Sequence, residues 1–245
     1  MKELSIWSIL TQLLYSSSSG LEFSPRDFPD FPSAQNGYNG LTNDVFIKQI
    51  HSHNDYWRER PLLTALSYGV QSVEADVWNF QSDYNPDDEI YVGHNLNRLS
   101  KDRTLDSLYL DPLYTMLEAH NPGDGDTVGG IAERLPSGVF ETDIHATLYV
   151  FIDFKSEGRA LFGKIEDKLA RFKEKDWLSH YDTVTGQFIW RPLTVIGTGN
   201  TPLESVLAMK DRYIFFDGPL GDLSDERIDH NVSPIASGAL RLLVG

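Results

Sequence analysis

The stretch Leu148-Tyr-Val-Phe-Ile-Asp-Phe-Lys155 decides the fold that we expect for this chain. Its first five residues, 148–152, are almost wholly apolar, which is typical of a parallel strand buried on both faces of a sheet. Asp153 and Lys155 follow two residues apart, so their side chains point to the same face at the end of the strand. The stretch therefore predicts a central parallel strand with a polar site at its carboxyl end.

Strands and helices are expected to alternate on both sides of this stretch. The expected strands are 45–50, 70–77, 90–92, 148–152, 193–196 and 213–216, and the expected helices are 61–68, 105–119 (divided by Pro112), 160–174 and 202–209. This alternation predicts a parallel α/β sheet. The glycine-rich phosphate loops of doubly wound folds do not occur, so we predict a (β/α) TIM-type barrel instead.

The length of 245 residues suits one α/β domain. Residues 45–245 are expected to form the barrel, which is incomplete at its C-terminus because only about six strands can be placed where a full barrel has about eight. Residues 21–44 form an irregular arm rich in Ser, Pro, Gly and Asn. Residues 1–20 suit either a signal peptide or a frayed helix. The first alternative implies a secreted or secretory-pathway protein, and the second an intracellular one.

Composition limits the chemistry that the chain can perform. The formal net charge is −15 and the sequence contains no cysteine. Without a basic cluster, such a chain would repel nucleic acid. Without cysteine, it can have neither a disulfide nor a nucleophilic thiol, and any metal must be held by oxygen and imidazole ligands. Oxygen ligands favour a hard cation such as Mg²⁺, with Ca²⁺ as the alternative.

Acidic side chains mark the expected metal site. Glu74 and Asp76 stand two residues apart in the strand 70–77, so both point to one face. Two carboxylates in an otherwise apolar strand would repel each other and lose hydration unless a cation neutralised them. Asp153 supplies a third carboxylate at the end of its own strand. The alternative is a pair of solvated acids at a strand end.

Two histidines are the expected acid and base. His53 and His94 follow the first and third expected strands, and imidazole titrates close to neutral pH. His51 could take the place of His53, but we prefer His53 because it lies nearer the end of the strand.

Three further residues are expected to contact the substrate or shape the site. Lys155 would meet a phosphate oxygen. Asn54 shapes the turn after the first strand, and Asp217 ends a later strand where it could contact a ligand.

Several separate blocks resemble the altered inheritance of mitochondria protein 6 family, in order along the chain. The blocks are His53-Asn-Asp-Tyr-Trp-Arg, Val73-Glu-Ala-Asp-Val77, Tyr91-Val-Gly-His94, Ser107-Leu-Tyr-Leu-Asp-Pro-Leu113 and Ile214-Phe-Phe-Asp-Gly-Pro219. That family is similar to the phospholipase C-like, or glycerophosphodiester phosphodiesterase-like, TIM-barrel superfamily. The resemblance implies that His53 and His94 are acid and base, that Glu74, Asp76 and Asp153 bind Mg²⁺ or Ca²⁺, and that Lys155 binds substrate.

The resemblance implies a metal-dependent phosphoric diester hydrolase acting on a glycerophosphodiester or (lyso)phospholipid-like substrate. A lipid substrate would bring the protein into peripheral contact with a membrane. The chain has His53-Asn-Asp where typical glycerophosphodiesterases have His-Arg-Gly, so the headgroup stays open. Two alternatives remain: a catalytically inactive barrel that serves as a binding or regulatory module, and a sugar hydrolase. Glycosidases need carboxylates on opposite sides of the scissile bond, which adjacent positions of one strand do not provide.

Overall fold

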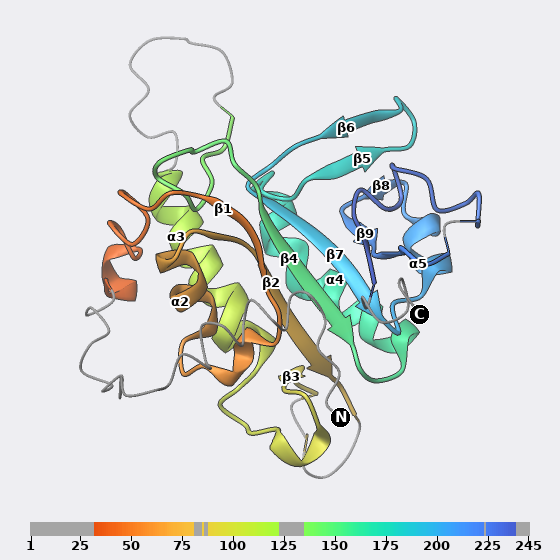
Figure 1. Ribbon diagram of the computed structural model, residues 1–245, viewed down its shortest axis with the longest axis horizontal. Helices are drawn as coiled ribbons and strands as arrows, with labels where there is room; N and C mark the ends of the chain where they lie inside the picture. The colour runs from red at the N-terminus through yellow and green to blue at the C-terminus, as the bar shows by residue number, and fades with distance from the viewer. Residues whose placement is uncertain (1–31, 81–84, 86–87, 123–134, 223, 239–245) are drawn as a thin grey trace.

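The computed structural model of this chain describes residues 32–80, 85, 88–122, 135–222 and 224–238 (Figure 1). The segment 1–20, expected to be a signal peptide or a frayed helix, lies outside these residues, as does the first part of the arm. In the described part of the arm, the one helix or strand is the short 3-10 helix η2, Ala34–Asn36.

A parallel sheet forms the centre of the molecule, with its strands in the order β1-β2-β4-β7-β9. The strands are β1 (Lys48–Ser52), β2 (Val70–Trp78), β4 (Leu148–Phe154), β7 (Leu193–Gly199) and β9 (Ile214–Phe216). In Figure 1 the arrows of β2, β4 and β7 point the same way. This confirms the parallel α/β prediction. The sequential order is compatible with a barrel-like α/β fold, whereas in a doubly wound sheet the order reverses. Among the described residues, the sheet is open and does not close into a barrel.

Helices connect these strands and cover one face of the sheet. They are η3 (Asp55–Trp57), α2 (Pro61–Ser67), η4 (Leu96–Arg98), the π-helical turn η5 (Asp106–Leu110), α3 (Asp111–His120), α4 (Gly158–Glu174) and α5 (Leu203–Ala208). Apolar side chains of α2, α3 and α4 pack with every second residue of the strands into the main core. Gly69 ends the α2 connection at φ +71°, and a Cβ there would lie 2.1 Å from the carbonyl oxygen of Phe46. Only glycine fits that turn.

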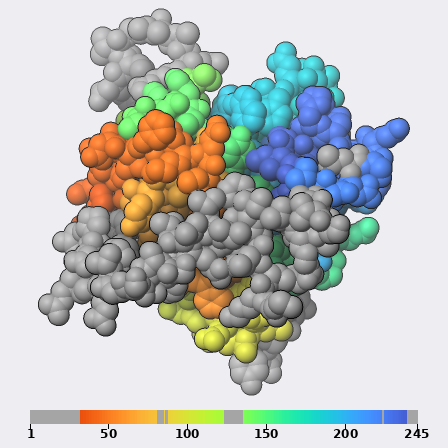
Figure 2. Space-filling view, in the orientation of Figure 1, coloured from red at the N-terminus to blue at the C-terminus, as the bar shows by residue number. Residues whose placement is uncertain are grey.

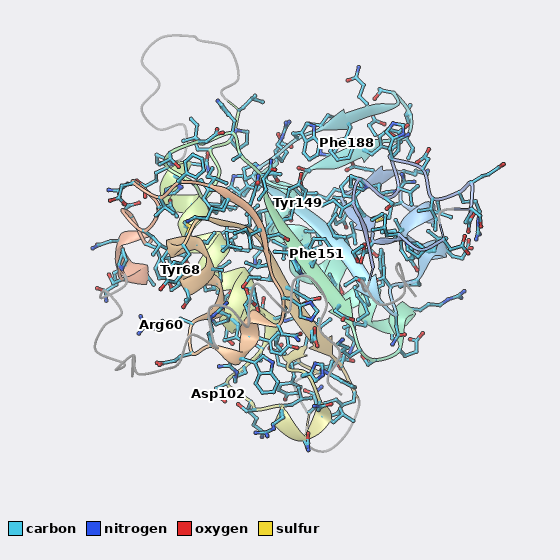
Figure 3. The ribbon with its side chains drawn as sticks, viewed as in Figure 1. Arg60, Tyr68, Asp102, Tyr149, Phe151 and Phe188 are labelled. Atoms are coloured by element: carbon cyan, nitrogen blue, oxygen red, sulfur yellow. The ribbon has the colours of Figure 1, made fainter. Side chains whose placement is uncertain are left out.

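The opposite face of the sheet carries the second set of alternating side chains. Phe151, Ile196 and Phe215 form one row across β4, β7 and β9, and they are buried in a smaller apolar cluster. Tyr149 and Phe151 lie along β4 in Figure 3, with Phe188 of the neighbouring hairpin above them. Phe188 stacks on Phe215 with 5.0 Å between ring centroids. This face therefore has an apolar middle and leads to a polar carboxyl end.

Two sequence expectations were wrong in detail, and one small sheet was missed. The first strand begins at Lys48 rather than Val45, so His51 lies inside it. The expected third strand is only β3, Tyr91–Val92, and it runs antiparallel to the end of β2. A small antiparallel sheet of β5 (His180–Asp182), β6 (Gln187–Ile189) and β8 (Asp211–Arg212) was not expected. Its cyan hairpin lies beside the blue C-terminal residues in Figure 2. Its strands are too short to show an alternating pattern in the sequence.

One further pair of very short strands links the end of the sheet to the C-terminal segment. β10 (Gly218–Pro219) pairs in parallel with β11 (Ala236–Ser237).

Candidate active site

Three carboxylates meet at the carboxyl ends of β2 and β4. Asp76 and Asp153 are register partners on these neighbouring parallel strands, and Glu74 precedes Asp76 by two residues on the same face. One oxygen from each of the three carboxylates lies within 4.8 Å of the others. Glu74 is 6% exposed and Asp76 1% exposed, so this negative charge is largely removed from water.

Lys155 is the one ammonium in ion-pair contact with these carboxylates among the described residues. Its Nζ lies 3.2 Å from Asp76 Oδ2 and 2.5 Å from Asp153 Oδ2. Burial alone would lower the pKa of Lys155, but its hydrogen bond to Asp153 and the charges of Asp153 and Asp76 outweigh burial and raise it. One positive charge against three acids leaves the cluster short of positive charge. Burial, aided by the neighbouring acids, raises the pKa of Glu74 to about 8, and burial also raises the pKa of Asp153.

Histidines from the end of β1 lie beside Glu74. His53 Nδ1 is 3.4 Å from Glu74 Oε2, and His51 Nε2 is 3.9 Å from the same oxygen. The other nitrogen of His51, Nδ1, lies 2.7 Å from Ser72 Oγ, and the His51 ring packs edge-on against Phe151. Burial lowers the pKa of His51 to about 4 and also lowers the pKa of His53. His51 is the more enclosed of the two, and half of the His53 side chain is exposed.

His94 lies beside Asp76, just after β3. Its Nδ1 is 3.4 Å from Asp76 Oδ2 and 3.3 Å from the hydroxyl of Tyr56. The Tyr56 hydroxyl in turn donates to Asp76 Oδ2 at 2.7 Å. About half of the His94 side chain is exposed. The five expected catalytic and metal-binding residues thus meet in one place, with one imidazole next to Glu74 and the other next to Asp76.

The donor set suits a hard divalent cation. Glu74, Asp76 and Asp153 offer only oxygen ligands, which Mg²⁺ and Ca²⁺ prefer. The buried atoms Asp76 Oδ1 and Asp153 Oδ1 have no hydrogen-bond partner. A buried carboxylate oxygen without a partner is costly unless a cation or a proton satisfies it. A second set, His51, His53 and Glu74, also brings three ligand atoms within 4.8 Å and shares Glu74 with the first.

The two remaining sequence candidates occupy different positions. Asn54 has φ +54° in the turn after β1, and its N–H donates to Glu74 Oε2 at 3.0 Å. Asp217 follows β9 and accepts hydrogen bonds from Thr198 at 2.9 Å and Ser237 at 2.5 Å. Thr198 is the register partner of Asp153, so Asp217 belongs to the same end of the sheet. No ion pair or hydrogen bond described here joins Asp217 to the three carboxylates.

Two contributors were not recognised from the sequence as parts of the site. Tyr56 was not among the residues expected to bind metal or catalyse, but its hydroxyl contacts Asp76. Gly199 has φ +63°, and a Cβ there would lie 2.0 Å from Asp153 Oδ1. The short 3-10 turn η3 places Tyr56 in the site, and such a turn has no periodic sequence pattern from which it could be predicted. For Gly199, the glycines of Gly197-Thr-Gly199 at a strand end are a sequence signal that could have indicated close packing, because glycine in a strand often marks a close approach.

Fold and site together define an α/β protein with a carboxylate and histidine centre at the carboxyl ends of parallel strands. The family model of the AIM6-like phosphodiesterase domain matches residues 39–217, well over half of the chain. The chain therefore belongs to the AIM6-like phosphodiesterase domain family. This confirms the family resemblance drawn from the separate sequence blocks.

Named relatives come from several fungi. The altered inheritance of mitochondria protein 6 homolog of Arthroderma benhamiae is 41% identical over 211 residues, covering 84% of this chain and 63% of the relative. Altered inheritance of mitochondria protein 6 of Eremothecium gossypii is 40% identical over 212 residues, covering 82% of this chain and 51% of the relative. The Saccharomyces cerevisiae protein of that name is 38% identical over 194 residues, covering 74% of this chain and 47% of the relative. The chain thus spans about half to two thirds of the length of these relatives. No solved structure gives a significant match.

None of the described helices combines the length and the hydrophobicity needed to cross a bilayer.

Proposed function

We propose that this chain is a metal-dependent phosphoric diester hydrolase that acts on a glycerophosphodiester or (lyso)phospholipid-like substrate. The observation that carries the proposal is the convergence of Glu74, Asp76 and Asp153 within 4.8 Å, with one imidazole beside Glu74 and another beside Asp76. Membership of a phosphodiesterase-like family supports the class of reaction.

Glu74, Asp76 and Asp153 would hold Mg²⁺, with Ca²⁺ as the alternative. When bound, the cation would polarise a phosphoryl oxygen and stabilise developing negative charge. Lys155, which already lies beside two of these carboxylates, would bind another phosphate oxygen. The excess negative charge of the three carboxylates would thereby be neutralised by the cation, which together with Lys155 would bind the phosphate anion.

The two histidines would transfer the protons. One imidazole would take a proton from the nucleophile, either water or a neighbouring hydroxyl of the substrate, as the new oxygen–phosphorus bond forms. The other would protonate the alcohol oxygen as its bond to phosphorus breaks. Both side chains are about half exposed at the mouth of the site, so a substrate can reach them. Asn54 and Asp217 would contact the substrate around the phosphate.

The test is a hydrolysis assay on the whole chain with three diesters: glycerophosphocholine, a lysophospholipid and bis-p-nitrophenyl phosphate. Alcohol release is measured with Mg²⁺, with Ca²⁺ and with chelator. The proposal expects release that a chelator abolishes and that Asp76→Asn and His94→Gln reduce while the circular dichroism spectrum stays unchanged. Absence of release with every substrate and metal would instead favour the binding-module alternative.

A further inference from the structure

The hydroxyl of Tyr56 lies where three polar groups of the site meet. Tyr56 belongs to η3 and is 3% exposed. Its oxygen is 2.7 Å from Asp76 Oδ2, 3.3 Å from His94 Nδ1 and 2.6 Å from Asn54 Oδ1. A phenolic hydroxyl has one proton to donate and two lone pairs that accept. The protons in this group can therefore be assigned by counting donors and acceptors.

The count fixes the state of the His94 ring. A carboxylate oxygen only accepts, so at 2.7 Å the Tyr56 proton must point to Asp76 Oδ2. Nδ1 of His94 then faces two acceptors, the Tyr56 oxygen at 3.3 Å and Asp76 Oδ2 at 3.4 Å. Nδ1 must carry a hydrogen, because otherwise its lone pair would face both oxygens. Because the single Tyr56 proton is given to Asp76, the Asn54 amide 2.6 Å away must present its NH₂ group to the Tyr56 oxygen.

The Tyr56 hydroxyl is held firmly in this position. Arg103 donates through Nη2 to the carbonyl oxygens of Tyr56, the middle residue of η3, and of Arg58, the residue after η3. Asp55, the residue before Tyr56, is wholly buried and accepts a hydrogen bond from Tyr109. The turn that carries Tyr56 is therefore anchored on both sides, and the hydroxyl acts as a fixed partner for a half-exposed histidine.

We propose that Tyr56 is a positioning residue that holds the His94 ring with Nδ1 protonated, so that Nε2 is the nitrogen that exchanges a proton with the substrate. The catalytic consequence rests on the proposed function, but the state of the ring does not. Tyr56 also fixes which oxygen of Asp76 remains available, because it occupies Oδ2 and leaves Oδ1 without a hydrogen-bond partner.

The first test needs no activity. A long-range ¹H–¹⁵N spectrum of the histidine rings is recorded at about pH 8, where an ordinary imidazole is neutral, and His94 is assigned with His94→Gln. The wild type should show the Nδ1–H tautomer, and Tyr56→Phe a mixture of both tautomers. Tyr213→Phe is the matched control, since it removes a tyrosine hydroxyl whose hydrogen-bond partner is Glu166, outside the site, and it should keep the wild-type tautomer. An Nε2–H tautomer in the wild type, or one unchanged by Tyr56→Phe, would overturn the proposal.

The second test is a double-mutant cycle at saturating metal. Tyr56→Phe should lower kcat about 10- to 100-fold with a smaller change in KM, because general acid–base catalysis is worth about 10²- to 10⁴-fold. In the His94→Gln background, the same substitution should lower kcat by less than about threefold, since the group it positions is gone. Equal losses in both backgrounds would mean a merely structural role and would refute the proposal. A wild-type chain without turnover would contradict the proposed function alone, because the ring spectrum would still decide this inference.

Discussion

Asp76 and Asp153 are paired residues of neighbouring parallel strands, and the ammonium of Lys155 contacts both of their carboxylates. This ammonium lies on the Oδ2 atom of both carboxylates, and the Oδ1 atom of both has no hydrogen-bond partner. In a metal-bound protein, Lys155 would therefore share the two carboxylates with the cation or turn towards the phosphate of the substrate. The contribution of Lys155 to metal binding and to turnover can be measured separately from that of the carboxylates.

Lys155→Met should separate metal binding from turnover. The substitution removes a positive charge that competes for Asp76 and Asp153, so Mg²⁺ should bind at least as tightly as in the wild type by calorimetry. Turnover of a phosphodiester should nevertheless fall about 10- to 100-fold, since an ionic hydrogen bond to phosphate is worth about 1.5–3 kcal/mol. Weaker Mg²⁺ binding in this variant would show that Lys155 supports the carboxylates instead of competing with the cation.

The stability of the metal-free protein should fall as pH rises. Burial, aided by the charges of Asp76 and Asp153, raises the pKa of Glu74 from 4.5 to about 8 in the folded protein. The folded state then holds this proton more tightly than the unfolded chain does. The contribution of Glu74 to the free energy of unfolding is therefore fully present below about pH 4.5 and is lost as the pH rises to about 8. Burial acts in the same direction on Asp55, whose pKa is raised to about 7.

Urea unfolding in chelator between about pH 5 and about pH 8 measures this dependence. Glu74→Gln, which cannot titrate, should flatten the curve relative to the wild type. Added Mg²⁺ should stabilise the wild type more at the higher pH, because binding must displace the proton. A wild-type curve as flat as that of Glu74→Gln would contradict the environment described for this carboxylate.

The histidines at the end of β1 should differ in their effect on catalysis. His53 is half exposed beside Glu74, whereas His51 is enclosed between Ser72 and Phe151. His53→Gln should lower kcat about 10²- to 10⁴-fold, the usual contribution of a general acid or base. His51→Gln should lower it by less than about tenfold and act mainly on stability. The reverse order in a steady-state assay would assign the catalytic role to His51.

Gly199→Ala, at the end of β7, should destabilise the protein and displace the Asp153 carboxylate. Residue 199 has φ +63°, and a Cβ would lie 2.0 Å from Asp153 Oδ1, so the carboxylate must move. A left-handed conformation costs a non-glycine residue about 1–2 kcal/mol, and the contact adds to this. The matched control is Gly163→Ala on the exposed surface of α4, where nothing lies within 4 Å of the new methyl group. It should stabilise the protein by about 0.5–1 kcal/mol. Similar stabilities for the two variants in urea would contradict this packing.

Periodic features of the fold could be predicted from the sequence. The apolar run of β4 and the spacing of Glu74 and Asp76 were sufficient to place three acids at one end of a parallel sheet. The alternation of strands with helices likewise predicted the parallel order. These predictions succeeded because a strand has a fixed side-chain period and parallel strands end together.

Features without a period could not be predicted. β3 is two residues long and antiparallel, and the hairpin of β5 and β6 has three residues in each strand. The position of the Tyr56 hydroxyl depends on the left-handed turn at Asn54 and the 3-10 turn after it. Such local turns are set by tertiary contacts, here the hydrogen bonds from Arg103, and not by residue spacing.

Calorimetric titration of the metal-free chain with Mg²⁺ and with Ca²⁺ tests most directly the claim that Glu74, Asp76 and Asp153 share one cation. The account predicts saturable binding of one equivalent of at least one of these ions, abolished or weakened at least about tenfold, or about 1.4 kcal/mol, by Asp76→Asn and by Asp153→Asn. No saturable binding of either ion by the folded wild type, or the same affinity in both variants, would contradict it.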